Sequence, residues 1–309
     1  MDGAHVRDVE FASGTVRLAG SWAIPRRLDE ACAGVVLVGG SGPTDRDNDS
    51  FFPPLRRHLL DAGFAVLSYD KRGVGGSSGD WRSATLTDLA ADANTAVRFL
   101  RSQPEVRPEA VGLFGHSEGG WVVLSAATAR DDMPWVVTNS CPGVSPAVQE
   151  RYALSHHLRK RQALDRSDIA HTLDLYDRLI EAGRHDADFA TAMRLVDAAG
   201  RPPGLASHWA DLDERLWEFL KRKQDHDPTE DLLTLRCPHL AFFGGADQLV
   251  PVADSLRVLG ACVCHGARAH SATLTVEVLP GADHRLRLPN AAEPPPTYFG
   301  TLTHWLHRH

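Results

Sequence analysis

The sequence has no long hydrophobic run, few cysteines and no excess of positive charge. No segment approaches the roughly 18 uncharged apolar residues of a membrane-spanning helix, and the first residues carry neither a basic stretch nor the apolar run of a secretory signal. We therefore expect a cytoplasmic protein with no membrane partner. The formal net charge of -7 argues against nucleic acid as a main partner, because phosphate binding needs a basic face, so no nucleic-acid partner is expected.

Cysteine is scarce, with 5 in 309 residues. An odd number of scattered cysteines suits a reducing compartment better than a disulfide framework. Cys262, Cys264 and His265 lie close together, but two cysteines one residue apart match no common zinc spacing. We predict no metal site and no cofactor.

Short apolar runs alternate with longer amphipathic segments in the first half of the chain. This pattern is typical of β-α-β units and of a mostly parallel sheet. Residues 6–24 alternate more loosely and predict an antiparallel edge hairpin. The predicted buried strands are 34–38, 64–69, 111–114 and 135–138, and the predicted helices between them are 53–62, 85–102 and 118–130.

The alternation breaks at residues 141–143, where a wholly helical and more charged stretch begins. Its four amphipathic helices must bury their apolar faces on something, and the nearest surface is the top of the predicted sheet. We therefore predict a helical cap over 143–233, inserted into an α/β core made of 1–142 and 234–309. The core pattern resumes with strands at 239–243 and 273–279 and helices at 252–259 and 298–306.

Helix start signals occur inside the predicted cap. Ser145 followed by Pro146 predicts an N-cap with proline in the first turn. Ser167 followed by Asp168 predicts the start of a second helix, and Gly183 predicts its end.

A serine flanked by glycines lies between a predicted strand and a predicted helix. Ser117 is the central residue of a Gly-x-Ser-x-Gly motif whose glycines are Gly115 and Gly119. A sharp turn strains the serine, and only small residues at the two glycine positions let the strand and helix approach closely. A structural turn serine is the alternative, but the strand, turn and helix context favours a nucleophile at a helix N-terminus.

Two later loops carry an acid and a histidine. A serine hydroxyl is a weak nucleophile without a base, and the base needs an acid that orients it. Asp247 ends a Gly-x-x-Asp loop after one predicted strand, and His284 ends a Gly-x-x-His loop after the next. Asp283 is a weaker candidate for the acid, because a residue adjacent to His284 tends to point away from its ring.

Together these motifs resemble those of α/β-hydrolase fold serine hydrolases, and the resemblance covers nearly the whole chain. It rests also on the glycine-rich loop at 39–43 with the acidic and basic residues at 45–47, and on the loop at 69–77. The resemblance implies a mostly parallel central sheet flanked by helices, with an inserted all-helical cap. The segment GSGPTDRD and the helical insert resemble a branch in which acyl esterase or thioesterase activity is the usual expectation.

The resemblance also implies a catalytic role for each matched position. Ser117 would attack an acyl carbonyl, His284 would take its proton, and Asp247 would orient the imidazolium.

The oxyanion would accept hydrogen bonds from the backbone N–H groups of Glu118 and Ser41, or of Gly42 if the loop is set one residue differently. Many relatives have histidine where this chain has Gly39, which bears on the placement of this loop rather than on the triad.

Other polar residues near these motifs have open or structural interpretations. We expect Asp70 and Arg72 to brace their loop, and we expect Cys141 to fill space. The side chain of Glu118 has no assigned role, because an acidic residue in a first helical turn is favoured by the helix dipole alone. The basic run at 156–161 is either a solvated helix face or a contact for an anionic substrate such as coenzyme A or a carrier-protein phosphopantetheine.

The leading hypothesis is a metal-independent serine hydrolase that cleaves a carboxylic ester or thioester of a small-molecule acyl substrate through an acyl-enzyme on Ser117. The cap would shape a largely apolar pocket, with Trp209, Trp217 and Phe219 as candidates for its lining.

Two alternative functions are compatible with the same fold. The same triad can serve acyl transfer or acyl-group elimination in small-molecule biosynthesis, and a non-catalytic ligand-binding homologue can retain the fold alone. A peptidase is disfavoured because no further domain of β-propeller size is present. Epoxide hydrolases and dehalogenases need an aspartate where this chain has Ser117.

Overall fold

The apolar runs of the sequence form one eight-stranded sheet, with strand order β1-β2-β4-β3-β5-β6-β7-β8. The computed structural model describes residues 4–26, 28–202, 204–205 and 212–309. Strands β3 to β8 run parallel to one another, whereas β2 is antiparallel to both of its neighbours, β1 and β4. The strands are β1 (Ala4–Ser13), β2 (Val16–Pro25), β3 (Cys32–Val38), β4 (Ala65–Tyr69), β5 (Val106–His116), β6 (Val136–Asn139), β7 (His239–Gly244) and β8 (Leu274–Leu279).

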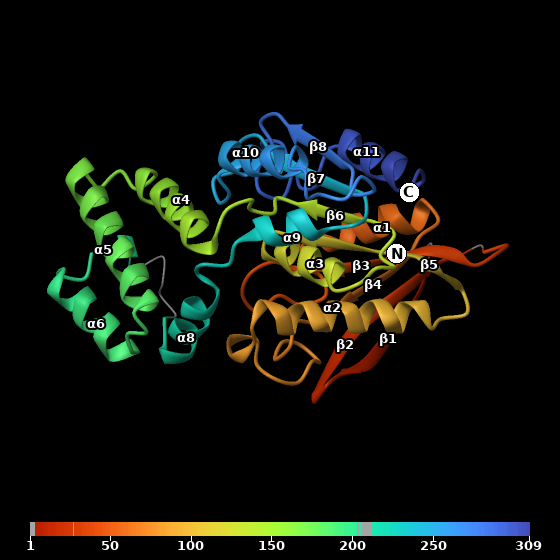
Figure 1. Ribbon diagram of the computed structural model, residues 1–309, viewed down its shortest axis with the longest axis horizontal. Helices are drawn as coiled ribbons and strands as arrows, with labels where there is room; N and C mark the ends of the chain where they lie inside the picture. The colour runs from red at the N-terminus through yellow and green to blue at the C-terminus, as the bar shows by residue number, and fades with distance from the viewer. Residues whose placement is uncertain (1–3, 27, 203, 206–211) are drawn as a thin grey trace.

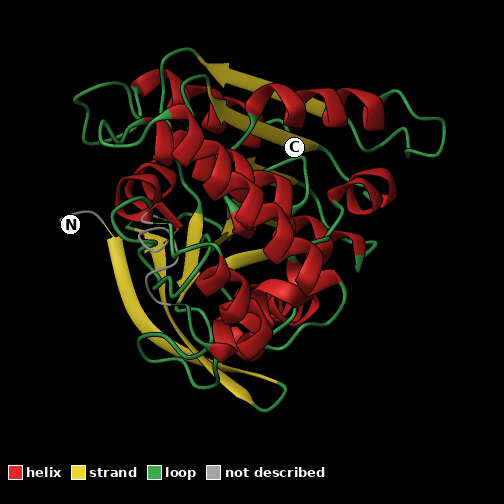
Figure 2. Cartoon of the chain, turned by 90° about the vertical axis from the view of Figure 1, so that its left-hand side faces the viewer, coloured by secondary structure: helices red, strands yellow, loops and turns green. Residues whose placement is uncertain are grey.

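Helices cover both faces of the sheet (Figures 1 and 2). Successive residues of a strand point to opposite faces, so Val35 packs in the cluster that contains α1 and α11, and Val36 in the cluster that contains α2, α3 and α10. The prediction of a mostly parallel α/β sheet flanked by helices is confirmed, as is the edge hairpin. The helices of this part are α1 (Phe52–Asp61), α2 (Leu86–Arg101), α3 (Glu118–Thr128), α9 (Pro228–Thr234), α10 (Val252–Val263) and α11 (Pro296–Leu306), with a short 3-10 helix η1 (Trp81–Ser83).

Four further helices stand beside the sheet as a separate lobe, at the left of Figure 1. They are α4 (Pro146–Arg159), α5 (Arg166–Arg184), α6 (Phe189–Ala198) and α8 (Glu214–Lys223). The expectation that their apolar faces are buried on top of the sheet is wrong. Leu154, Tyr176 and Trp217 belong to a hydrophobic cluster of the lobe's own, because four amphipathic helices have enough apolar surface to form a small core together.

The lobe reaches the core through particular contacts. The Tyr152 hydroxyl of α4 donates to the Asp247 carbonyl at 3.1 Å, and the Gln149 side chain donates to the Leu249 carbonyl at 2.8 Å. Helix α9 lies inside the predicted cap range, but its Leu232 packs in the main core. The domain division at 143 and 233 stays a prediction.

The predicted N-cap residue is correct for α4 and wrong for α5. Ser145 caps α4 as predicted. The N-cap of α5 is Asp165 rather than Ser167, because the Asp165 and Asp168 side chains each accept from the other's backbone N–H. A start at Ser167 would place an alanine three residues later, which cannot return that bond. The helix also continues through Gly183 to Arg184.

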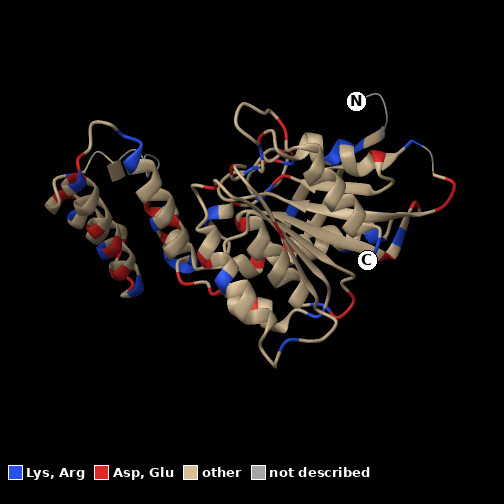
Figure 3. Ribbon diagram, turned by 90° about the horizontal axis from the view of Figure 1, so that it is seen from above, with Lys and Arg blue, Asp and Glu red and all other residues tan. Residues whose placement is uncertain are grey.

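Charged residues of both signs lie along the lobe helices (Figure 3), whereas strands β3, β4, β6 and β7 of the sheet contain no Asp, Glu, Lys or Arg. Among the described residues, no helix is both long and apolar enough to cross a membrane.

Candidate active site

Ser117 occupies a sharp turn between β5 and α3. Its backbone has φ of 55° and ψ of -123°, a region that L-residues rarely adopt. The Ser117 N–H donates to the Asn139 carbonyl at 2.9 Å, and the Gly120 N–H donates back to the Ser117 carbonyl at 2.8 Å. Bonds on both sides therefore hold the strained residue at the carboxyl end of the central strands.

The two glycines of the motif are sterically required. A Cβ atom on Gly115 would lie 2.2 Å from the Gly119 carbonyl oxygen, and a Cβ atom on Gly119 would lie 2.4 Å from the Val38 carbonyl oxygen. Both neighbours are backbone atoms of the sheet and helix, so the chain could not shift locally to admit a methyl group. The expectation of small residues at both positions is confirmed.

The structure brings Asp247 and His284 together. Asp247 Oδ2 lies 2.8 Å from His284 Nδ1, and the carboxylate is fully buried. Its other oxygen accepts from the backbone N–H groups of Leu249 at 2.8 Å and Val250 at 3.0 Å. With both oxygens occupied, Asp247 accepts the Nδ1 proton of His284 and leaves Nε2 as an acceptor.

Asp283 is directed away from this pair. Its carboxylate accepts from the backbone N–H groups of Arg285 at 2.8 Å and Arg287 at 2.9 Å, and it pairs with the Arg287 guanidinium. These bonds shape the loop that presents His284.

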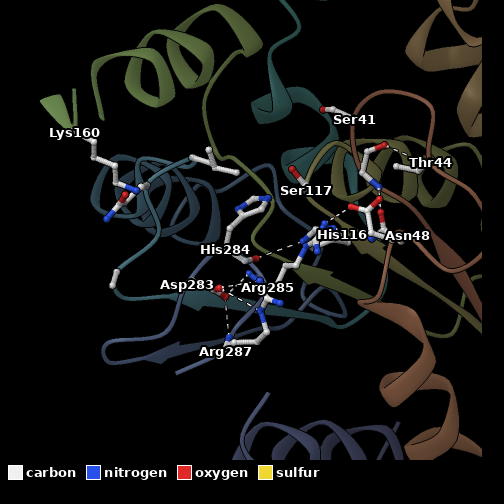
Figure 4. A pocket seen from close by; sticks show the side chains of 15 residues that line it. Ser41, Thr44, Asn48, His116, Ser117, Lys160, Asp283, His284, Arg285 and Arg287 are labelled. Atoms are coloured by element: carbon white, nitrogen blue, oxygen red, sulfur yellow. Dashed lines mark hydrogen bonds and ion pairs between the residues drawn. The ribbon is translucent and has the colours of Figure 1, made fainter. Parts of the chain in front are cut away.

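Ser117 and His284 line one cavity of about 580 Å³, and their side chains lie next to each other (Figure 4). No hydrogen bond joins the two side chains; catalytic contacts of this kind often tighten only when substrate binds. The cavity is lined by Gly40, Ser41, Thr44, Asn48, Asp49, His116, Ser117, Lys160, Ala246, Gln248, Leu249, Asp283, His284, Arg285 and Arg287.

Most of the residues that line this cavity carry polar or charged side chains, and the aromatic residues expected in its lining lie elsewhere or outside the described residues. Trp217 lies in the lobe core, where its indole N–H donates to the Ala187 carbonyl at 2.9 Å. Phe219 packs edge-on against Trp81, with ring centroids 5.1 Å apart. Neither lines the cavity, and Trp209 lies outside the described residues.

The glycine-rich loop after β3 approaches the serine most closely at Gly40. A Cβ atom on Gly40 would lie 3.3 Å from the Ser117 Cβ. The backbone N–H groups of Ser41 and Glu118 donate no hydrogen bond within the described part of the chain. Both are therefore open to a developing oxyanion, and their assignment to that role stays a prediction.

Two residues that sequence reasoning did not single out support this loop. The Asn48 side chain accepts from the Gly40 N–H at 3.2 Å and contacts His116 Nδ1 at 2.9 Å. His116 is buried between this loop and the His284 loop. Burial, and then the charge of His284, lower the pKa of His116 well below its usual range.

Glu118 is almost fully buried between two lysines, an arrangement with no signal in the local sequence. Glu118 Oε1 lies 3.0 Å from Lys71 Nζ, and Oε2 lies 2.7 Å from Lys223 Nζ. Burial alone would raise the pKa of Glu118, but the charges of Lys223 and Lys71 outweigh it and lower the pKa to about 2. The carboxylate is therefore ionised.

Asp70 and Arg72 brace loops, as expected. Asp70 accepts from the backbone N–H of Arg46 and pairs with its guanidinium, each at 2.8 Å. Arg72 forms a two-pronged pair with Asp92 of α2, with both contacts at 2.7 Å. Among the described residues, no group of three or more His, Cys, Asp or Glu side chains is arranged to hold a metal ion.

The sheet order, the serine turn and the positions of the acid and histidine loops define a hydrolase of the α/β-hydrolase fold. The chain belongs to the serine aminopeptidase S33 family, whose family model matches residues 31–288.

Individual relatives are more distant. The thiohydrolase aneE of Aspergillus aculeatus is 33% identical over 106 residues, which are 33% of this chain and 33% of that protein. The human palmitoyl-protein thioesterase ABHD10 is 21% identical over 225 residues, or 73% of this chain and 58% of that protein. The matched stretch thus spans between a third and three-fifths of these two relatives.

Solved structures share the fold across the whole chain. The esterase Pf2001 of Pyrococcus furiosus superimposes with a TM-score of 0.63 at 18% identity, covering 99% of this chain and 91% of that one.

Proposed function

We propose that this protein hydrolyses a carboxylic ester or thioester of a small-molecule acyl substrate through an acyl-enzyme on Ser117. The observation that carries the proposal is the 2.8 Å contact between His284 Nδ1 and Asp247 Oδ2, made at the edge of the cavity that the strained serine enters. A buried, hydrogen-bonded pair of this kind beside a serine that lines a cavity is the arrangement that converts a hydroxyl into a nucleophile.

In the first step, Ser117 Oγ bonds to the acyl carbonyl carbon while its proton passes to His284 Nε2. Asp247 stabilises the resulting imidazolium through Nδ1. The N–H groups of Glu118 and Ser41 stabilise the oxyanion, and the helix α3 N-terminus adds a favourable dipole. Collapse returns the proton from His284 to the departing alcohol or thiol.

In the second step, water gives a proton to His284 and its oxygen attacks the acyl carbon. The second tetrahedral intermediate collapses, Ser117 takes back its proton, and the carboxylic acid leaves. No cofactor or metal enters either step. Transfer of the acyl group to another acceptor would use the same groups. Gln248, which lines the cavity, is exposed to solvent, and this access favours water as the acceptor.

The cavity favours an ester or thioester over an aminopeptidase substrate. An aminopeptidase needs a carboxylate that is free to hold the substrate's α-ammonium group. The two carboxylates that line the cavity, Asp49 and Asp283, are each paired with an arginine, Arg285 and Arg287 respectively. The names of the thiohydrolase, the thioesterase and the esterase among the similar proteins support the same preference.

The position of Lys160 favours one class of these substrates, a thioester of coenzyme A or of a carrier protein. Lys160, at the end of α4, lines the cavity on the far side from Asn48 (Figure 4) and makes no ion pair with the described residues. The other two lining cations are already paired with carboxylates. Lys160 is thus placed to contact a phosphate or carboxylate on the leaving group.

The proposed location is the cytoplasm. All five cysteines are free thiols, and four of them are buried, as suits a reducing compartment.

Kinetics on a matched substrate panel test the function. Acetyl and butyryl p-nitrophenyl esters, acetyl-coenzyme A and leucine p-nitroanilide would be compared in the wild type and in His284→Ala. We expect ester or thioester turnover that falls by about 10³-fold or more in the variant. Turnover of the anilide alone would assign an aminopeptidase, and turnover of none would favour a non-catalytic homologue.

A further inference from the structure

The buried carboxylate of Glu118 joins three parts of the chain that are distant in sequence. Glu118 begins α3, Lys71 follows β4, and Lys223 ends α8 of the helical lobe. Only 1% of the Glu118 side chain is exposed, against 9% for Lys71 and 8% for Lys223. One lysine would be enough to neutralise Glu118, yet two are buried with it. Burying the second ammonium group costs desolvation free energy, which suggests that the cluster has a function.

Lys71 links this cluster to the loop that carries the expected oxyanion donor. Lys71 Nζ donates to the Gly40 carbonyl at 2.5 Å while it also contacts Glu118 Oε1. The Gly40 carbonyl and the Ser41 N–H belong to one planar peptide group, in which they point in opposite directions. A lysine that holds the carbonyl therefore fixes the direction of the Ser41 N–H.

Glu118 holds the same loop by a second contact. The Ser41 hydroxyl donates to Glu118 Oε2 at 3.3 Å, on the oxygen that also accepts from Lys223. Glu118 contributes the other expected N–H from its own backbone. One carboxylate thus sets the relative position of both donors.

Lys223 is held in place by its own helix. Its ammonium lies 4.6 Å from the Phe219 ring centroid, and Phe219 packs against Trp81 of the core. The start of α8 is tied to the core as well, because Asp213 accepts from Arg82 at 3.0 Å. The helical lobe therefore presents Lys223 to Glu118 from a fixed direction.

We propose that Lys223 is a positioning residue through which the helical lobe holds the oxyanion loop, by way of Glu118 and Lys71. With Lys223 present, each carboxylate oxygen has its own ammonium group, and Lys71 remains between Oε1 and the Gly40 carbonyl. Without Lys223, Oε2 keeps the Ser41 hydroxyl but lacks an ammonium group, so it draws Lys71 away from Gly40 and the Ser41 N–H loses its direction. This inference rests on the proposed serine hydrolase function.

The test compares Lys223→Met with Lys221→Met. Lys221 lies on the same helix and is similarly covered, but it pairs with Asp186 and Glu218, both at 2.8 Å, and not with Glu118. Rates would be expressed per active site titrated with a fluorophosphonate, so that misfolded molecules do not count.

For Lys223→Met we expect kcat on the best ester to fall about 10-fold to 100-fold with KM changed less than about threefold. The affinity for a boronic acid, whose adduct on serine carries a negative oxygen, should fall by the same factor, while affinity for the carboxylic acid product stays unchanged. Lys223→Arg should recover part of kcat. Lys221→Met should match the wild type.

A second variant guards against loss of folding. Glu118→Gln keeps the shape of the side chain but removes the charge that attracts both lysines, and it should show the same loss of kcat and of boronate affinity. Equal kcat in Lys223→Met and Lys221→Met, or a loss of kcat in Glu118→Gln without loss of boronate affinity, would overturn the inference. A wild type that turns over no ester or thioester would instead refute the proposed function.

Discussion

The side-chain amide of Asn48 lies 2.9 Å from Nδ1 of His116, deep between the two loops that flank Ser117. The oxygen of that amide is already occupied, because it accepts from the Gly40 N–H. The amide nitrogen must therefore face His116 and donate to Nδ1. His116 is then neutral with its proton on Nε2, which lies 3.4 Å from the His284 carbonyl.

Asn48→Asp tests this arrangement. Asn48 has φ of 47°, a left-handed conformation that aspartate also tolerates, and the carboxylate can still accept from Gly40. It presents an acceptor to the acceptor Nδ1 of His116, so we expect the free energy of unfolding to fall by about 1–3 kcal/mol in urea at pH 8. The ¹⁵N shifts of the His116 ring should report a proton moved to Nδ1. An unchanged tautomer and unchanged stability would contradict the assignment.

Asp247→Asn separates the orienting acid from its structural bonds. An amide oxygen can still accept from the Leu249 and Val250 N–H groups, so folding should be preserved. The amide cannot favour the Nδ1–H tautomer of His284 or stabilise an imidazolium, and kcat should fall by about 10³- to 10⁴-fold. Asp283→Asn is the matched control, with activity expected within about threefold of the wild type. Comparable losses in both variants would contradict the assignment of Asp247.

Much of this site is readable from the sequence because its determinants are local. Ser117 is recognisable from the strand before it and the helix after it, and Asp247 and His284 follow strands with clear apolar runs. The Glu118 cluster is not readable, because Lys223 stands 105 residues away on a helix whose docking depends on tertiary packing.

The sequence prediction misplaced the starts of α5 and β5 and did not predict the hydrophobic core of the lobe. The spacing of Asp165 and Asp168 in the sequence matches a capping box. The prediction used Ser167 as the N-cap instead, and so placed the helix start two residues too late. Strand β5 begins at Val106, five residues before the apolar run, because backbone pairing with β3 at Cys32 extends it past the exposed Arg107 and Glu109. The hydrophobic core of the lobe was not predicted, because the pattern of an amphipathic helix shows that one face is buried but not which surface that face packs against.

Gly119→Ala should be severely destabilising. The added Cβ would meet the carbonyl oxygen of Val38, the last residue of β3, at 2.4 Å and that of Gly39, the first residue after it, at 2.5 Å. We expect a loss of about 3 kcal/mol or more in the free energy of unfolding, measured by chemical denaturation. Gly260→Ala in α10 meets nothing within 4 Å and should instead stabilise by up to about 1 kcal/mol. Similar values for the two variants would argue against tight strand and helix contact at the serine turn.

Asp231 predicts a pH-dependent stability unrelated to catalysis. Burial raises the pKa of Asp231 from 3.8 to about 6. The folded state therefore binds the proton more tightly than the unfolded chain, so the stabilisation is complete below about pH 4 and is lost as the pH rises through about 6.

Asp231→Asn is neutral at every pH and can still accept from the Thr128 hydroxyl. It should be more stable than the wild type by about 1–2 kcal/mol at pH 8, after allowance for partial exposure, and equal to it at pH 4. Melting curves across this range measure the difference. A constant difference between Asp231→Asn and the wild type would disprove the assigned burial effect.

The most direct measurement of the catalytic proposal is labelling of the purified protein with a fluorophosphonate, followed by intact mass and peptide mapping. Reaction with the wild type should add one phosphonate, located on Ser117, and labelling should be absent in Ser117→Ala and slowed by orders of magnitude in His284→Ala. An unlabelled wild type, or an adduct on another residue that persists in Ser117→Ala, would contradict the assignment of Ser117 as the nucleophile.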